Sequence, residues 1–206
     1  MRVCSTPCDA GRVVVTIAIP STAKAGETLL VDRARRGDRE AFESLIDVRL
    51  GSAFRTAMAI LGNEADARDA TQDTFVRVWR DLAGLRDVGL FDQWFGRVLV
   101  NTCRSAARGR GRRWVREVAV TAMPGAGVDF DPPAESRDLR SWDDEMVSRA
   151  LDRLSVAERT LLVLHYYEEL SLAEIADRVG IPARTVKSRL FTARRALERA
   201  VEGERR

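Results

Sequence analysis

The 206-residue sequence contains little of what most enzymes need. It has one histidine, His165, and three cysteines, of which Cys4 and Cys8 lie near the start of the chain and Cys103 far from both. Three cysteines cannot form a disulfide framework, and their spacing, without a nearby histidine, matches no zinc motif. There is no glycine-rich phosphate loop, and no nucleophile and acid accompany His165. The sequence therefore predicts no catalytic residue, no cofactor and no metal, with His165 at the surface or core edge of a helix.

Long apolar runs are also missing. The longest early stretch, residues 13–20, is interrupted by Thr16, whereas a membrane span needs about 18 or more apolar residues. No persuasive secretory signal is present. Hydrophobic residues make up 45% of the chain and charged residues 32%, which is typical of a globular protein. We therefore expect a soluble, cytoplasmic protein without membrane insertion.

Charge is unevenly distributed along the chain. The net charge is only +3, but residues 104–116 carry six arginines and no acidic residue. Residues 129–145 instead carry seven acidic residues. A basic block followed by an acidic one is typical of a nucleic-acid surface followed by a linker.

The spacing of apolar residues predicts an all-α fold of two small helical domains. Helices are expected over 28–36, 38–61, 63–82 and 91–108, with N-caps at Asp38 and Asn63 and stops at Gly37 and Gly62. Proline and glycine break any regular element in the segment that follows. The expected organisation is a disordered tail (1–26), a helical domain (27–115), a flexible linker (116–141) and a second helical domain (142–206).

The second domain carries a helix-turn-helix pattern. Two capping boxes, Ser155 with Glu158 and Ser171 with Glu174, each predict the start of a helix. The helix after Ser171 is expected to end before Gly180, and a longer helix begins after a three-residue break. A short helix, a tight turn and a longer helix are typical of a DNA-binding unit.

The last helix has an apolar stripe and a basic face. At about 100° per residue, the stripe contains Val186, Leu190, Ala193, Leu197 and Ala200. The opposite side carries Arg184, Lys187, Ser188, Phe191 and Arg195, flanked by Thr192 and Arg199. Long cationic side chains suit phosphates and guanine edges, although the same pattern would suit a solvated face of an ordinary helix.

The first domain has two further polar surfaces. Over 63–82 an apolar stripe predicts the core, and a polar face made of Asp66, Asp69, Gln72 and Asp73 is by default solvated. On the next helix Phe91 and Trp94 are followed by arginines. Aromatic rings beside arginines suit the stacking of unpaired bases, and they equally suit a plain core, which is the preferred reading for Trp94 alone.

The order of these motifs resembles one protein family. The sequence DATQDTF (69–75), then FDQW (91–94) with Asn101, then LSLAEIA (170–176) with TVKSRL (185–190), is similar to the sigma-70 transcription initiation factors of bacteria. It looks like the small extracytoplasmic-function group, which keeps only regions 2 and 4. The resemblance covers residues 27–113 and 143–202.

The resemblance implies a factor that is not itself an enzyme. Such a factor binds core RNA polymerase, at the clamp helices of the largest subunit and at the flap, and recognises promoter DNA, and an anti-sigma factor commonly masks it. Core-polymerase contacts are expected at Asp69, Gln72, Asp73 and Phe75. The loop from Arg86 to Leu90 would capture a flipped base of the minus-10 element, and the minus-10 set is Arg86, Phe91, Trp94, Asn101, Arg104, Arg108, Arg112 and Arg113. The minus-35 set is Arg184, Thr185, Lys187, Ser188, Arg189, Phe191 and Arg195.

One alternative belongs to another class. An autonomous helix-turn-helix repressor or activator would use its first domain to bind a ligand or to dimerise. That protein would bind duplex DNA tightly without polymerase, usually at a symmetric site. A sigma factor would bind free DNA weakly and use an asymmetric, bipartite site.

Overall fold

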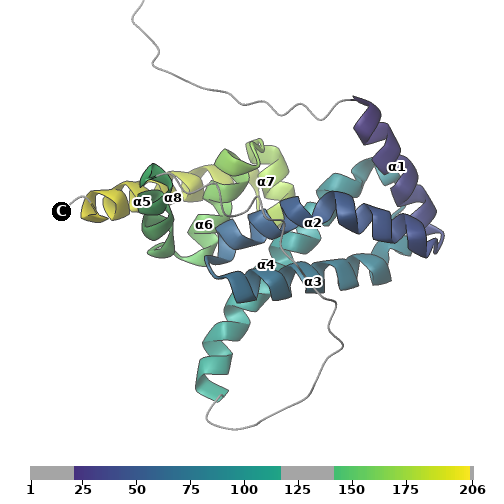
Figure 1. Cartoon of the computed structure of the whole chain (residues 1–206). Helices are drawn as coiled ribbons and strands as arrows, with labels where there is room; N and C mark the ends of the chain where they lie inside the picture. The colour runs from purple at the N-terminus through teal and green to yellow at the C-terminus, as the bar shows by residue number, and fades with distance from the viewer. Residues whose placement is uncertain (1–20, 117–141, 205–206) are drawn as a thin grey trace, which may run out of the picture.

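The computed structural model describes residues 21–116 and 142–204, with side chains over 26–109 and 146–204. These residues are helical and contain no strand, which confirms the all-α prediction (Figure 1). None of the described helices is long and apolar enough to cross a lipid bilayer. The elements are α1 (Ser21–Arg35), α2 (Arg39–Leu61), α3 (Glu64–Asp81), the 3₁₀ turns η1 (Leu82–Gly84) and η2 (Val88–Leu90), α4 (Phe91–Arg116), α5 (Trp142–Asp152), α6 (Val156–Leu162), the π-helical turn η4 (Val163–Tyr167), α7 (Leu172–Val179) and α8 (Ala183–Glu204).

The predicted helix caps of the first half are confirmed. The Asp38 side chain accepts a hydrogen bond from the Ala41 backbone N–H at 3.0 Å, and Asn63 does the same for Asp66 at 3.0 Å. Gly62 ends α2 with φ 67°, a left-handed conformation that favours glycine. These short-range hydrogen bonds explain why α2 and α3 begin within a residue of the predicted positions.

Two helix boundaries differ from the prediction. The first helix begins at Ser21 rather than at residue 28, so the end of the expected tail is helical. Its later turns are anchored by buried Val31 and Ala34 and by an ion pair between Glu27 and Arg49. The fourth helix continues to Arg116 rather than ending at residue 108, because arginine is a good helix former and glycine weakens a helix without necessarily ending it.

The first four helices share one apolar core. Helix α2 packs against α1 and α3, and α3 packs against α4. The stripe predicted on α3 is buried, as expected, with Ala67 and Val78 both at 0% exposure. Cys103 of α4 is fully buried in this core, and burial raises the pKa of its thiol to about 12. Cys4 and Cys8 lie outside the described residues.

The helix-turn-helix prediction is confirmed in the second half. Both capping boxes are formed, at Ser155 and at Ser171. Helix α7 ends at Gly180 with φ 74°, and α8 follows after a short turn. Its apolar stripe is buried except for half-buried Leu197.

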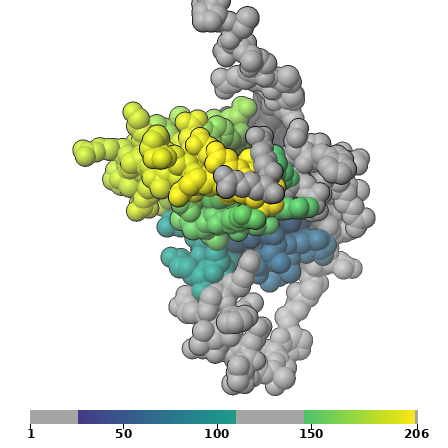
Figure 2. Space-filling view, turned by 90° about the vertical axis from the view of Figure 1, so that its left-hand side faces the viewer, coloured from purple at the N-terminus to yellow at the C-terminus, as the bar shows by residue number. Residues whose placement is uncertain are grey.

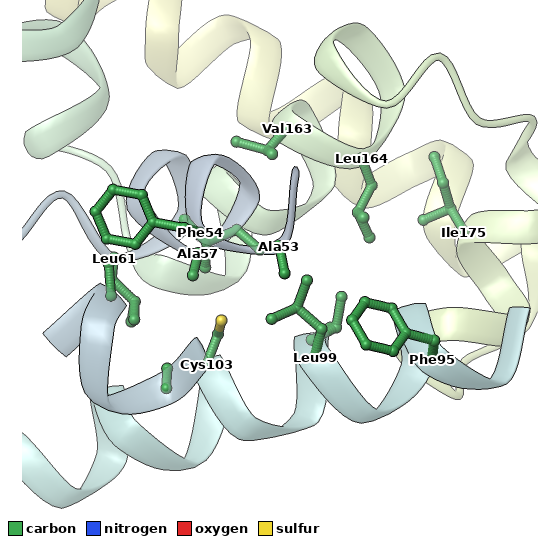
Figure 3. Close-up of a cluster of buried hydrophobic side chains, with 14 of the residues drawn as sticks. Ala53, Phe54, Ala57, Leu61, Phe95, Leu99, Cys103, Val163, Leu164 and Ile175 are labelled. Carbon is green, nitrogen blue, oxygen red and sulfur yellow. The ribbon is translucent and has the colours of Figure 1, made fainter. Parts of the chain in front are cut away.

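The two halves pack directly on each other (Figure 2). Helix α7 lies against α4, and α6 with η4 lies against α2. Figure 3 shows side chains from both halves pointing into a common cluster, with Ala53 and Ala57 of α2, Leu99 of α4, Leu164 of η4 and Ile175 of α7 among them. The apolar core therefore continues across the boundary between the two halves. The spacing of apolar residues in the sequence did not predict this contact.

Candidate nucleic-acid interface

The turn before α8 fixes where its basic face points. The Pro182 carbonyl accepts hydrogen bonds from the Thr185 and Val186 backbone N–H groups, at 2.8 and 3.0 Å. Val186 and Ile175 are both 0% exposed, so they join α8 to α7 through the core. This anchoring leaves the opposite side of α8 in solvent.

That opposite side carries five of the predicted minus-35 residues, and the other two, Thr185 and Arg189, lie nearer the apolar stripe. All of them are exposed except half-buried Thr185. Phe191 is 62% exposed, which is unusual for so large an apolar ring. The Ser188 hydroxyl donates to the Thr185 carbonyl at 3.1 Å, so it can still accept a bond from a partner. The face thus combines long cations with one flat ring and one short hydroxyl.

A groove with apolar and charged walls borders this face. Its volume is about 580 Å³, and it is lined by Leu162, Tyr166, Phe191 and Leu197 together with Arg194, Arg195 and Glu198. Tyr166 is 51% exposed, and the Arg194 guanidinium lies 5.2 Å from its ring centroid. The cation therefore covers one face of the ring and forms part of the groove wall.

The polar face of α3 lies in solvent on the other half. Asp69, Gln72 and Asp73 are exposed, and they follow one another at helical spacing. Val76 is 60% and Trp79 is 43% exposed, and they extend the same face toward the end of α3. The sequence analysis did not assign Val76 and Trp79 to this face, although their helical spacing from Gln72 places them on it.

Phe75 does not belong to that exposed face. Its side chain is only 7% exposed, and its ring centroid lies 5.6 Å from that of Phe95. The ring faces the core on the side of α3 away from Asp73, so the predicted contact of Phe75 with polymerase has no exposed surface in this structure and stays a prediction.

The loop between α3 and α4 is mostly exposed. The Asp87 side chain accepts from the Gly89 backbone N–H at 2.8 Å, which closes a tight turn at η2. Arg86 is exposed, and Leu90 is 52% exposed. The loop therefore presents one long cation and one apolar side chain to solvent.

The two aromatic residues after this loop are placed differently. Phe91 is 3% exposed, and its ring centroid lies 5.7 Å from Phe95 and 6.0 Å from Trp94. A ring this buried offers no face for stacking in this structure, so the predicted role of Phe91 at the minus-10 element stays a prediction. Trp94 is half-buried and packs against the core, in line with the interpretation preferred for it from the sequence.

Two arginines tie this loop region to α1 and α2. The Arg35 Nη1 donates to the carbonyls of Leu85 at 3.0 Å and Arg86 at 3.3 Å. Arg49 forms ion pairs with Glu27 and Asp92. Burial acts to lower the pKa of Arg49, but its hydrogen bonds with these carboxylates and their negative charges outweigh this effect and raise the pKa.

The basic residues of α4 are partly covered by α7. Asn101 and Arg108 are exposed, whereas half-buried Arg104 donates to the Val179 carbonyl at 3.1 Å. Asp177 accepts from Gln93 and lies 3.8 Å from Arg97. Asn101 and Arg97 also line a cavity of about 510 Å³ with residues 176–182 of the helix-turn-helix. The side chains of Arg112 and Arg113 lie outside the described residues.

The single histidine lies where the sequence predicts it. His165 is half-buried at the core edge, with Nδ1 3.1 Å from the Leu170 carbonyl oxygen. Over the part of the chain that is described, no three histidine, cysteine or acidic residues are grouped as metal ligands would be.

Comparison with known proteins gives a consistent result. Residues 45–113 match the family model for sigma-70 region 2, and residues 144–197 match that for sigma-70 region 4. The chain is 31% identical to the RNA polymerase sigma-H factor of Pseudomonas aeruginosa over 180 residues, which cover 84% of this chain and 92% of that factor. It is 28% identical to the ECF RNA polymerase sigma-E factor of Haemophilus influenzae over 181 residues, covering 84% and 94% of the two chains.

Two solved structures have a similar fold. The first is CnrH in complex with the cytosolic domain of CnrY, with a TM-score of 0.61 and 22% identity over 86% of this chain and 98% of that chain. The second is the sigma factor RpoE in complex with the anti-sigma factor NepR from Bartonella quintana, with a TM-score of 0.58 and 21% identity over 78% and 96%. At this identity the likeness concerns the fold alone.

Proposed function

This chain belongs to the extracytoplasmic-function group of the sigma-70 family, and so it is a promoter-recognising initiation factor rather than an enzyme. We propose which of its surfaces bind core polymerase and which bind promoter DNA. The observation that carries the proposal is the presence on one chain of an exposed acidic face on α3 and an exposed basic face on α8. The first suits a protein partner with a basic surface, and the second suits DNA.

Core polymerase binds the exposed face of α3. Asp69 and Asp73 supply negative charge, and Gln72 supplies an amide that can both donate and accept. Val76 and Trp79 add exposed apolar surface next to these polar groups, a combination typical of protein interfaces. The buried Phe75 ring anchors α3, and with it this exposed face, to the core. The groove beside Phe191 is a candidate contact for the polymerase flap.

The minus-10 element binds the loop of residues 86–90 and the adjacent side of α4. Leu90 and half-buried Trp94 contact an extruded base, and buried Phe91 supports them from below. Arg86, Asn101, Arg104 and Arg108, together with Arg112 and Arg113, hold the phosphate backbone of the melted strand. Stacking on aromatic groups and a basic track are the usual means of holding single strands.

The minus-35 element binds α8 in the major groove. Lys187, Ser188 and Arg184 lie near the start of the helix, where residues of a recognition helix contact base edges. Arg189 and Arg195 contact phosphates, and Phe191 meets apolar atoms such as a thymine methyl group. Many phosphate contacts predict a steep fall in DNA affinity as salt is raised.

The closed packing of the two halves must open before both elements are bound. Arg104 donates to the Val179 carbonyl, so helix α7 occupies part of the surface that would hold the melted strand. Elements centred about 10 and about 35 base pairs upstream of the start lie about 85 Å apart, at about 3.4 Å per base pair. Helices α4 and α7, which are in contact here, cannot span that distance while they stay packed together.

We extend two further properties to this chain from its relatives. The similar structures of CnrH and RpoE contain a protein partner, which for RpoE is named an anti-sigma factor. An anti-sigma factor that stabilises the closed packing would keep the factor inactive until it is released. The cytoplasm is the proposed location, because polymerase and the chromosome are there.

The first test is run-off transcription with purified core polymerase on a library of DNA fragments. New defined start sites that require this protein, and that share an asymmetric bipartite motif, would support the proposal. Tight binding to a symmetric duplex site without polymerase, and no start sites, would instead support an autonomous repressor or activator. Asp69→Ala with Gln72→Ala should weaken polymerase binding, whereas Glu64→Ala, an exposed acid at the start of the same helix, should leave it unchanged.

A further inference from the structure

Helix α1 makes specific contacts with the loop of residues 86–90. It ends at Arg35, well before residue 45, where the match to the region 2 family model begins. The Arg35 guanidinium uses Nη1 to reach the carbonyls of Leu85 and Arg86, at 3.0 and 3.3 Å, and Nη2 to reach Asp32 at 2.9 Å. The planar fork therefore joins one acid of α1 to the start of the loop.

The loop's internal hydrogen bonds set its shape but do not attach it to another helix. The Leu90 backbone N–H donates to the Asp87 carbonyl at 3.1 Å, and the Asp87 side chain accepts from Gly89 at 2.8 Å. Both bonds stay within η2 and its cap. The Arg35 bonds are different, because they connect residues 50 and 51 positions apart in the chain.

The far end of the loop is held through a second arginine. Arg49 of α2 forms an ion pair with Asp92, and its guanidinium carbon lies 5.8 Å from the Phe91 ring centroid. Its other partner is Glu27 of α1, whose side chain is only 13% exposed. Helix α1 thus supplies an acid for each arginine, Asp32 for Arg35 and Glu27 for Arg49, and the two arginines hold the two ends of the loop.

We infer that α1 braces the base-capturing loop, and that Arg35 is a positioning residue for promoter opening. The inference rests on the proposed role of residues 86–90 at the minus-10 element. A loop that must accept an extruded base works best when it is already ordered, because ordering it during binding would cost conformational entropy. Arg35 acts through the backbone of the loop and does not need to touch DNA.

The chain offers a matched control next to Arg35. Arg36 pairs with the other carboxylate oxygen of the same Asp32, and its side chain is 72% exposed. Arg35→Gln and Arg36→Gln therefore remove the same charge from the same end of α1. Only the first removes the hydrogen bonds to the Leu85 and Arg86 carbonyls, at the start of the loop.

Hydrogen exchange on the free protein tests the brace directly. Amides of residues 86–90 should exchange about fivefold faster in Arg35→Gln than in wild type, the effect expected for the net loss of about one hydrogen bond, and Arg36→Gln should match wild type. Exchange in α3 should be the same in all three proteins, which shows that the fold is intact. Equal exchange of the loop amides in the two variants would overturn the inference.

Transcription tests the consequence for opening. The template is a promoter found by the fragment library, used once as a full duplex and once with its minus-10 region opened beforehand by mismatches. Arg35→Gln should initiate about five- to tenfold more slowly on the duplex and recover most of its activity on the opened template, with unchanged binding to polymerase. Arg35→Lys, which can still reach a carbonyl, should show an intermediate defect.

The possible results separate this inference from the proposed function. A wild-type protein that directs no start site would overturn the proposed function, and with it any role of α1 in opening. A wild-type protein that initiates normally, together with an unimpaired Arg35→Gln, would overturn this inference alone. Equal loss on both templates, with weaker polymerase binding, would mean a general structural defect and would also overturn it.

Discussion

A covalent bridge between α4 and α7 should inactivate the factor. Gln93 and Asp177 are hydrogen-bonded across the boundary between the two halves, so both can be replaced by cysteine and joined by a short reducible cross-linker. Cys4 and Cys8 would be replaced by serine. Cys103 can remain, because it is fully buried and its thiol pKa is raised to about 12, so little reactive thiolate forms.

The expected loss follows from distance. In the closed form Asn101 and the turn residues Gly180 and Pro182 line one cavity, whereas the promoter elements lie about 85 Å apart. Residues 117–141 reach about 85 Å when fully extended, at about 3.4 Å per residue. This length cannot separate the two halves while α4 and α7 stay joined. The transcription that remains should therefore equal the fraction of molecules that escaped cross-linking.

The assay is run-off transcription before and after the reductant cleaves the bridge. Activity should return on reduction. A control bridge between Arg153→Cys and Glu204→Cys joins two residues that form an ion pair within the second half, and it should leave activity unchanged. Full activity of the Gln93–Asp177 bridged protein would refute the reasoning, because it would show that the closed form already binds a promoter.

Three further predictions concern single residues. Phe75→Ala should lower the free energy of unfolding by about 3 kcal/mol, measured by urea denaturation, because it empties a buried site rather than an interface. Ser171→Ala should cost about 1 kcal/mol by removing a helix cap. Hydrogen bonds from the Ser171 hydroxyl and backbone lower the pKa of Glu174 below its ordinary value of 4.5, so its contribution to stability should be present above that pH and disappear as the pH falls further. Stability measured between pH 3 and 6 should show this loss in wild type and less of it in Ser171→Ala. Lys187→Ala should weaken binding of the holoenzyme to its promoter and reduce the slope of log affinity against log salt by about 1, whereas Glu202→Ala on the same helix should change neither.

The closed packing also bears on regulation. The Val179 carbonyl binds Arg104, a side chain of α4 that we assign to promoter DNA, and Asp177 binds Gln93 and Arg97 of the same helix. Arg178 lies so close to Gly96 that a Cβ atom there would come within 2.5 Å of its guanidinium carbon. A larger residue at position 96 would therefore displace the Arg178 side chain from this contact. A partner that binds across both helices would have to do little more than stabilise a contact that the chain already makes.

Much of the local structure could be predicted from the sequence. Asp38, Asn63, Ser155 and Ser171 identified helix starts, because a capping side chain bonds to a backbone N–H two or three residues away. The helical spacing of residues around Val186 predicted which side of α8 is buried and which side is basic and exposed. The order of motifs was sufficient to indicate the family, because it combined two independent patterns on one chain.

Other features depended on the tertiary structure. Phe75 and Phe91 were assigned to interfaces from their place in a motif, but the folded chain buries both rings against Phe95. A ring's exposure depends on which distant helix packs over it, and no spacing within one helix contains that information. The start of α1 was missed for a similar reason, since Glu27 is held by Arg49 on the next helix.

The sequence alone thus determined where most helices start, which sides of them are apolar, and which family the motifs indicate, because these properties depend on residues within one or two turns of each other. Only the tertiary structure decided that α7 covers Arg104 and that Arg35 reaches the carbonyl of Leu85. Both contacts join residues at least 50 positions apart in the chain, and they form only after the helices have packed.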